Sequence, residues 1–261
     1  MKFGWKPGTD DAKDYDFNSF SAQIVKLAAV ASTAPNNQYL IKELTPISNQ
    51  LDLSSCVANS TCDALEILLG LTGKVVQLSR LFVYWNARSY IKMTNQDQGS
   101  YIKDAFASLT KDGVCPESVW DYKTENVFKQ PSIEAYRQAS DNTITTYYKI
   151  KSTGQQRLKD IEIAIRANHP VVFGTGVTKN FCDNKFDPNI VLSAPKQNEI
   201  IGLHAMIITG VRTMNNKLQF YIRNSWGESW GTQGHAWIDS SYILHPTTDD
   251  LWVPTLMNKI I

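Results

Sequence analysis

The sequence predicts an α+β fold with two lobes, because helical and strand patterns occupy different parts of the chain. Capped helical segments fill the first part, up to about residue 168. After Pro170 the pattern changes to short runs rich in β-branched residues. A chain of 261 residues can bury such a core without disulfides or metal ions. We therefore expect a cleft between a helical lobe and a strand-rich lobe, with a functional site in it.

The predicted helices are identified by the residues that begin and end them. Ser54 or Ser55 caps the first helix of the middle part, Ser79 caps the second and Ser100 caps the third. Pro170 ends the fourth, because the residue before a proline leaves the helical region. A further helix is expected near the N-terminus. The expected ranges are 20–31, 56–69, about 80–92, 101–111 and 158–168.

The predicted strands follow Pro170 and are separated by polar segments. They span 171–177, 205–212, 217–223 and 234–238. Asn215-Asn216 separates two of these runs, and asparagine tolerates the positive φ that a tight hairpin turn needs. We therefore expect a hairpin at this position, within the sheet of the second lobe.

The chain divides into an N-terminal arm at residues 1–45 and a main domain at residues 46–261. Within the main domain we expect a helical lobe mainly at 46–140, a β-rich lobe mainly at 141–240 and a C-terminal tail at 241–261. The arm begins polar and acidic, but Trp5 and Phe17 are apolar anchors in it. It therefore either lies across the cleft like a pro-segment and blocks it, or packs on the back of a lobe.

Charge and hydropathy argue against several function classes. Twenty-six basic and 25 acidic residues leave a net charge of +1, which predicts neither nucleic-acid nor membrane-surface binding. Runs such as 201–211 are shorter than the ~20 apolar residues of a membrane span. The first ten residues lack the apolar stretch of a secretory signal, and the four cysteines lack the spacing of a disulfide framework or zinc site. We expect reduced thiols and an intracellular, cytoplasmic setting.

Cys56 is the candidate nucleophile, because it begins a predicted helix. The unpaired N–H groups and the dipole at a helix N-terminus stabilise a thiolate. A cysteine is also often a small buried apolar residue, and placement alone leaves that alternative open. Cys62 lies about 240° further around the same helix, so we expect it to face the core.

His204 is the candidate base among four histidines. It opens the predicted strand at 205–212, where a side chain can be aimed into a cleft. A thiol near neutral pH needs such a base, and the base needs a third group that fixes its tautomer. A buried core histidine is the alternative at this position. His169 and His245 each precede a proline and fit loop positions, whereas His235 lies beyond the segment described next.

The segment 224–234 reads Asn-Ser-Trp-Gly-Glu-Ser-Trp-Gly-Thr-Gln-Gly and carries two Trp-Gly pairs. It follows the sequence Gly-Leu-His-Ala at 202–205 and, far upstream, Gln50 shortly before Cys56. The ~150 residues between Cys56 and His204, and the ~20 from there to Asn224, fit the spacing of a cysteine, histidine and asparagine site. Order, spacing and local sequence together resemble the papain-like cysteine peptidases, papain and the cathepsins, and above all their microbial branch. The resemblance covers roughly residues 46–240.

The resemblance implies a role for each matching residue. Asn224 is expected to orient the His204 ring, and Trp226 to cover the bond between them. Gln50 and the backbone N–H of Cys56 are expected to bind the oxyanion that forms during acyl transfer. The implied fold is the papain-like one, with the site in the cleft between the two lobes.

Other positions match less closely or depart from the family. Trp230 is expected to wall the leaving-group side of the cleft, and Ala205 to leave room for a substrate side chain. For both tryptophans plain core packing is the alternative. Ser54 stands where the family has glycine, which predicts a tighter wall beside the nucleophile, and Leu51 replaces a second glycine. Leu53 replaces a disulfide cysteine of the plant and animal enzymes, so that bond cannot form.

The expected function is cysteine-type endopeptidase activity on peptide or protein substrates, through a thioester on Cys56 and without a metal or organic cofactor. Two alternatives remain. A transglutaminase-like acyl transferase shares the cysteine and histidine but normally places a carboxylate, not Asn224, behind the histidine. An inactive peptide-binding relative would keep the cleft, but such relatives usually lose one of the site residues first. Labelling of Cys56 and a comparison of hydrolysis with amine transfer would separate these classes.

Overall fold

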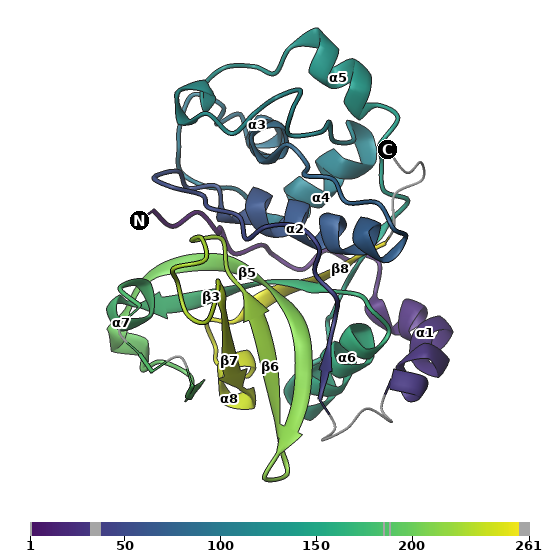
Figure 1. Cartoon of the computed structure of the whole chain (residues 1–261), viewed down its shortest axis with the longest axis vertical. Helices are drawn as coiled ribbons and strands as arrows, with labels where there is room; N and C mark the ends of the chain where they lie inside the picture. The colour runs from purple at the N-terminus through teal and green to yellow at the C-terminus, as the bar shows by residue number, and fades with distance from the viewer. Residues whose placement is uncertain (1, 32–37, 185, 188, 256–261) are drawn as a thin grey trace.

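The chain folds into two lobes in the computed structural model, which describes residues 2–31, 38–184, 186–187 and 189–255 (Figure 1). The lobe at the top of Figure 1 is helical, and the lobe below it is built on a sheet. The prediction of an α+β fold with a helical and a strand-rich lobe is confirmed. Among the described helices, none is both long and apolar enough to cross a membrane.

The helical lobe is centred on α2, a helix that is buried on all sides from Cys56 to Gly70. Its neighbours α3 and α4 cover one side, and the sheet lobe covers the other (Figure 1). A helix surrounded in this way carries mainly small and apolar residues, although α2 also buries Asp63 and Glu66. The bounds are α2 Cys56–Leu71, α3 Arg80–Tyr90, α4 Ile102–Lys111, the 3-10 helix η2 Thr124–Asn126 and α5 Ile133–Ala139.

The second lobe contains a mixed sheet with the strand order β2-β8-β3-β5-β6-β7-β4, and β1 pairs with β5. The long strand β5 pairs with β3 on one side and with β6 on the other, both antiparallel. The strands are β1 Tyr39–Leu40, β2 Tyr147–Lys149, β3 Val171–Thr178, β4 Val191–Leu192, β5 Ile200–Met214, β6 Lys217–Arg223, β7 His235–Asp239 and β8 Asp249–Pro254.

Short helices surround this sheet, and α1 from the N-terminal arm is one of them. α1 packs against α6 beside the sheet lobe (Figure 1), with Phe17 buried and the Phe20 ring stacked on Tyr148 at 4.6 Å. The helical part of the arm therefore packs on a lobe. The bounds are α1 Phe17–Ala31, α6 Gly154–Arg166, α7 Lys179–Cys182, η3 Gln197–Glu199 and α8 Ser240–Ile243.

Local signals in the sequence have mixed outcomes. Ser79 caps α3 as predicted, since its side chain accepts the N–H of Phe82. Asn215 and Asn216 form the predicted hairpin turn, with φ of 51° and 57°. Ser100 does not cap α4, because the chain turns into the helix at the next residue and the Ser100 backbone pairs with the N-terminal arm instead.

The stretch 241–261, expected as a C-terminal tail, contributes to the second lobe where the structure describes it. Most of α8 and the whole of β8 lie in it, and β8 pairs with both β2 and β3. β8 is short and follows a run of polar residues, so no alternating apolar pattern in the sequence predicts a strand there. The sheet is therefore completed by residues beyond the range of the sequence resemblance.

Candidate active site

Cys56 is the first residue of α2 and lies fully buried between the lobes. The residue before it, Ser55, is the N-cap, but its hydroxyl contacts the Tyr122 hydroxyl at 2.5 Å and makes no capping bond. The backbone N–H groups of Ala205 and Gly4 approach the sulfur and favour its thiolate. The start of a helix and two N–H donors thus surround this sulfur with partial positive charge.

His204 lies on β5, next to Ala205, and its imidazole is fully buried. Its Nε2 lies 2.8 Å from Asn224 Oδ1. Because an amide oxygen can only accept, Nε2 carries the proton of the neutral ring in this arrangement. Nδ1 has no hydrogen-bond partner among the described residues. That nitrogen therefore carries a free lone pair in the neutral ring.

Asn224 follows the last residue of β6 and is held from two sides. Its Oδ1 also accepts the backbone N–H of Ser225 at 2.8 Å, and its own N–H donates to the carbonyl of Gly234 at 2.9 Å. The Trp226 indole stacks on the His204 ring, with centroids 4.4 Å apart and planes inclined by 23°. The Trp226 ring therefore covers one face of the His204 imidazole.

Trp230 packs against Trp226. The two indoles meet edge to face, with centroids 5.9 Å apart. Trp230 Nε1 donates to the carbonyl of Phe181 at 2.8 Å, and its ring packs on the Phe181 ring at 4.8 Å. Trp230 is buried, so it exposes little surface in this conformation and mainly supports the Trp226 ring.

Gln50 is brought to the site by the pairing of residues 48–50 with residues 225–227. Its N–H donates to the carbonyl of Ser225 at 2.8 Å, and the Ser225 hydroxyl donates to Gln50 Oε1 at 2.9 Å. These bonds turn the amide so that Nε2 points away from Ser225. Nε2 donates to the carbonyls of Leu53 at 2.8 Å and Lys2 at 3.1 Å. The Lys2 carbonyl thus already accepts a bond from the amide that is expected to bind the oxyanion.

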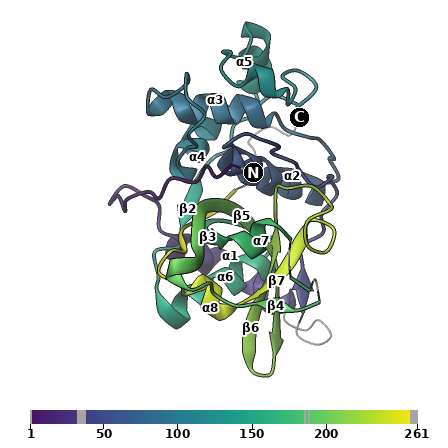
Figure 2. The ribbon, with the colours of Figure 1, turned by 90° about the vertical axis from the view of Figure 1, so that its left-hand side faces the viewer.

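The Lys2 carbonyl belongs to the N-terminal arm. Residues 2–8 of this arm run between the two lobes (Figure 1, Figure 2). The arm pairs in parallel with the loop before α4. The Ser100 N–H donates to the carbonyl of Gly4 at 2.8 Å, and the Lys6 N–H donates to the carbonyl of Ser100 at 3.1 Å. The Phe3 ring lies on Gly202 and the Trp5 ring on Gly174, where a Cβ would overlap each ring. Residues 2–8 thus lie between the lobes, whereas α1 of the same arm packs on α6.

Burial between the lobes sets the charge state of Cys56 and His204. Burial raises the pKa of Cys56 to about 11, although the backbone donors act against it. Burial also lowers the pKa of His204 to about 4, against the bond to Asn224, which favours the protonated ring. At neutral pH both groups are therefore neutral in this conformation. In this conformation desolvation outweighs the helix start and the backbone donors, which favour the expected thiolate.

The loop before the nucleophile is tied down without a disulfide. Ser54 donates its N–H to Asp97 Oδ1 at 2.9 Å and its hydroxyl to the Asp97 carbonyl at 3.0 Å. Tyr84 donates to the same Oδ1 at 2.7 Å. Leu51 has a φ of 50°, a left-handed conformation that suits the glycine of the family better. Asp97 and Tyr84 were missed in the sequence, since no local motif marks a residue that acts through a distant loop.

A cluster of ion pairs lies next to Asn224 and is centred on Arg223. Arg223 Nη1 lies 2.7 Å from Glu43 Oε2, and Arg223 Nε lies 3.3 Å from Asp63 Oδ2. His235 Nε2 lies 3.0 Å from the same Glu43 oxygen. Burial would raise the pKa of Glu43, but His235 and Arg223 outweigh it and lower the pKa to about 2. His235 therefore belongs to this structural cluster.

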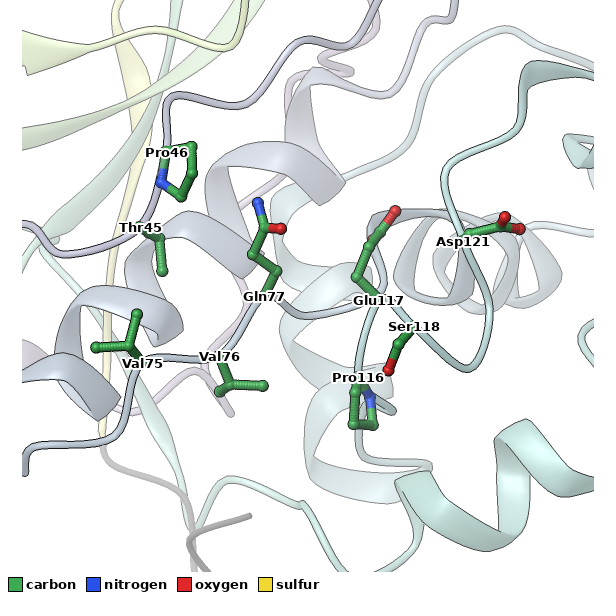
Figure 3. Close-up of a pocket in the computed structure, with 9 residues that line it drawn as sticks. All are labelled: Thr45, Pro46, Val75, Val76, Gln77, Pro116, Glu117, Ser118 and Asp121. Carbon is green, nitrogen blue, oxygen red and sulfur yellow. The ribbon is translucent and has the colours of Figure 1, made fainter.

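The remaining thiols and a separate cavity lie outside the site. Cys62 is fully buried on α2, as expected, and all four cysteines are free. No cluster of metal-ligating side chains occurs in the described part of the chain. A cavity of about 620 Å³ opens on the side of the helical lobe (Figure 3). It is lined by Thr45, Pro46, Val75, Val76, Gln77, Pro116, Glu117, Ser118 and Asp121, and not by the candidate catalytic residues.

Comparisons with known proteins agree with the resemblance. The family model described as papain family cysteine protease matches residues 36–244. Among solved structures, xylellain, a cysteine protease from Xylella fastidiosa, is 26% identical with a TM-score of 0.80, covering 97% of this chain and 96% of that one. Procathepsin L 3 of Tenebrio molitor is 20% identical with a TM-score of 0.66, covering 92% of this chain and 79% of that one, and shows the same fold. The predicted papain-like architecture is confirmed.

Curated relatives give the same picture at lower coverage. An uncharacterized peptidase C1-like protein of Acanthamoeba polyphaga mimivirus is 29% identical over 78% of this chain and 68% of its own length. A cysteine protease of Blomia tropicalis is 24% identical over 76% of this chain, which spans 59% of that enzyme. Some relatives are thus considerably longer than this chain.

Proposed function

Because this chain belongs to the papain family of cysteine proteases, which are hydrolases of peptide bonds, we propose that it is an endopeptidase with Cys56 as nucleophile and His204 as base. The observation that carries the proposal is the state of the His204 ring. Asn224 holds Nε2 at 2.8 Å, while Nδ1 is buried without a described hydrogen-bond partner and the neighbouring Ala205 N–H approaches the sulfur. This arrangement fits a base held ready for a thiol proton.

The reaction has two halves. The Cys56 proton passes to His204 Nδ1, and the thiolate attacks the scissile carbonyl, so that a C–S bond forms and the carbonyl π pair moves onto oxygen. His204 then protonates the leaving amine as the C–N bond breaks, which leaves a thioester. Water gives a proton to His204 and adds to the thioester. The C–S bond breaks, and the acid product leaves with the thiol restored.

The oxyanion of each half would lie between Gln50 Nε2 and the backbone N–H of Cys56. Ser225 supports this role because its hydroxyl fixes Gln50 Oε1 at 2.9 Å. Tyr122 supports it from the other side, since its hydroxyl donates to the Gln50 carbonyl at 2.9 Å. A donor held by such a network needs little reorganisation when charge develops on the substrate.

The same proposal assigns the N-terminal arm as a self-blocking segment. Residues 2–8 fill the place of a substrate, with the Lys2 carbonyl on Gln50 and the Gly4 N–H on the sulfur. The Trp5 ring is 5% exposed and covers Gly174, which pairs with Ala205 beside the nucleophile. Peptide substrate and arm therefore compete for one cleft, and hydrolysis requires that the arm leaves.

Titration with an epoxysuccinyl peptide tests the assignment of Cys56. We expect one adduct per chain, located on Cys56 by peptide mass mapping and lost in Cys56→Ala. Cys62→Ala is the matched control, since Cys62 lies on the same helix but faces the core, and it should still be labelled. Hydrolysis of a fluorogenic peptide with no amine incorporation would separate a peptidase from an acyl transferase. A labelled chain that cleaves no peptide would favour the inactive relative.

A further inference from the structure

Asp97 places a carboxylate at the wall of the cleft next to the nucleophile loop. Its Oδ1 accepts the Ser54 N–H at 2.9 Å and the Tyr84 hydroxyl at 2.7 Å. These two bonds fix the carboxylate in one orientation. Burial raises the pKa of Asp97, but hydrogen bonds from Lys2, Tyr84 and Ser54 outweigh it and leave that pKa below its ordinary value. The group is therefore a fixed negative charge at neutral pH.

The second oxygen of this carboxylate faces the arm. Lys2 Nζ lies 2.8 Å from Asp97 Oδ2, while the carbonyl of Lys2 lies 3.1 Å from Gln50 Nε2. Lys2 thus contacts the Gln50 amide with its backbone carbonyl and Asp97 with the end of its side chain. The distance from the Gln50 amide to Asp97 is therefore one that a lysine side chain spans. When the arm leaves, Asp97 Oδ2 loses its ammonium partner.

We infer that Asp97 is a specificity residue that selects lysine or arginine as the substrate residue whose carbonyl is attacked. The inference rests on the proposed function and adds a substrate class to it. The other nearby cation, Arg88, donates to backbone carbonyls such as those of Tyr84 and Gln96. Arg88 therefore does not occupy Asp97 Oδ2, and a cation that enters the cleft can bind this oxygen. A charge-assisted bond to a carboxylate is worth more than a neutral one, and arginine can make two such bonds.

The size of the preference follows from the exposure of the pair. The Asp97 side chain is 7% exposed, but the Lys2 side chain is 52% exposed, so water screens part of the attraction. We expect kcat/KM to be about fivefold to tenfold higher for lysine than for norleucine, which has a similar length without the charge. The ratio should fall as salt is raised from low to about 0.5 M, because salt screens a half-exposed pair.

The test uses the full chain and three peptides that differ only in the residue before the cleaved bond, which is lysine, arginine or norleucine. Mass spectrometry verifies the cleaved bond. Asp97→Asn keeps an oxygen for Ser54 and Tyr84 but removes the charge, and it should bring the lysine-to-norleucine ratio close to one. Asp121→Asn, an acidic side chain lining the separate cavity of Figure 3, is the matched control and should keep the ratio. Lys2→Met removes the ammonium of the arm, so any gain in rate should be equal for all three peptides.

The outcomes are distinct. Equal cleavage of lysine and norleucine peptides by the unmutated chain, or an unchanged ratio in Asp97→Asn, overturns the inference and leaves the peptidase assignment intact. No cleavage of any peptide and no labelling at Cys56, both in the unmutated chain and in Gly4→Ala, whose Cβ would push the arm from the Ser54 backbone, overturns the proposed function and the inference with it. If Asp97→Asn does not fold, the ratio and its salt dependence in the unmutated chain decide.

Discussion

A methyl group on Gly4 should open the arm and activate the enzyme. Gly4 lies against the backbone of the nucleophile loop, and a Cβ there would overlap the carbonyl group of Ser54. A Cβ on Gly99 would in turn overlap the Gly4 carbonyl group, so the loop before α4 also lies in backbone contact with the arm. Because the Ser54 carbonyl belongs to the backbone, it cannot rotate away as a side chain would. Gly4→Ala therefore disturbs the arm at its tightest point and changes no candidate catalytic residue.

The magnitude can be worked from the contacts of the arm. The backbone and amide bonds at Lys2, Gly4 and Lys6 contribute about 0.5–1.5 kcal/mol each. Burial of Trp5 contributes about 1.5–3 kcal/mol before the entropy of ordering the arm is subtracted. Overpacking against fixed atoms typically costs about 1–3 kcal/mol. Since 1.4 kcal/mol is a factor of ten, Gly4→Ala should raise the open population about 5- to 150-fold.

Two assays report that population. Initial rates on a fluorogenic peptide and the rate of Cys56 alkylation at pH 7 should rise by the same factor, because both need the open cleft. Thr9→Ala, at an exposed position of the same arm, is the control and should leave both rates unchanged. A synthetic peptide of residues 2–9 should inhibit the opened variant. A folded Gly4→Ala chain with unchanged hydrolysis and unchanged alkylation would refute the self-blocking role.

The remaining predictions concern the site itself. Gln50→Ala in the opened chain should lower kcat by about 10²–10³-fold with a smaller effect on KM, because it removes one oxyanion donor, and steady-state kinetics check this. Tyr122→Phe should lower kcat less, since only the support of Gln50 is lost, and an effect equal to that of Gln50→Ala would argue against this reasoning. The pKa of His204 is about 4 in the folded chain and about 6.5 in the unfolded chain. The unfolded chain therefore binds the proton first as pH falls. The free energy of unfolding should be unaffected by this group above pH 6.5 and should decline by up to about 3 kcal/mol toward pH 4. Urea unfolding at pH 7 and pH 4.5 measures this loss, which should be absent in His204→Gln.

The parts of the fold predicted well are those fixed by local sequence. Ser79 has the hydroxyl that a helix start needs, and Asn215 tolerates the turn conformation, so their positions could be read directly. β8 could not be read, because its place depends on pairing with β2 and β3 and not on its own pattern. Ser100 was misassigned for a related reason, since a distant segment takes its backbone groups.

The candidate site shows the same division. Cys56, His204, Asn224 and Gln50 stand in recognisable local motifs, and the structure brings them together although their catalytic roles stay predictions. Asp97 carries no motif, and its importance appears only once the loop before α2 and the arm are folded beside it. The charge state of Cys56 and His204 could not be predicted either, because it depends on how deeply the fold buries both groups.

The pH dependence of Cys56 alkylation in the opened chain tests most directly whether Cys56 and His204 act as a pair. With the arm displaced by Gly4→Ala, we predict a reactive thiolate well below the ordinary thiol pKa of about 8.5, because the protonated imidazole stabilises it. In the double variant Gly4→Ala, His204→Ala the alkylation profile should move to about 8.5 or above. Identical profiles in the two chains would show that the thiol does not depend on His204, and would contradict the catalytic pair.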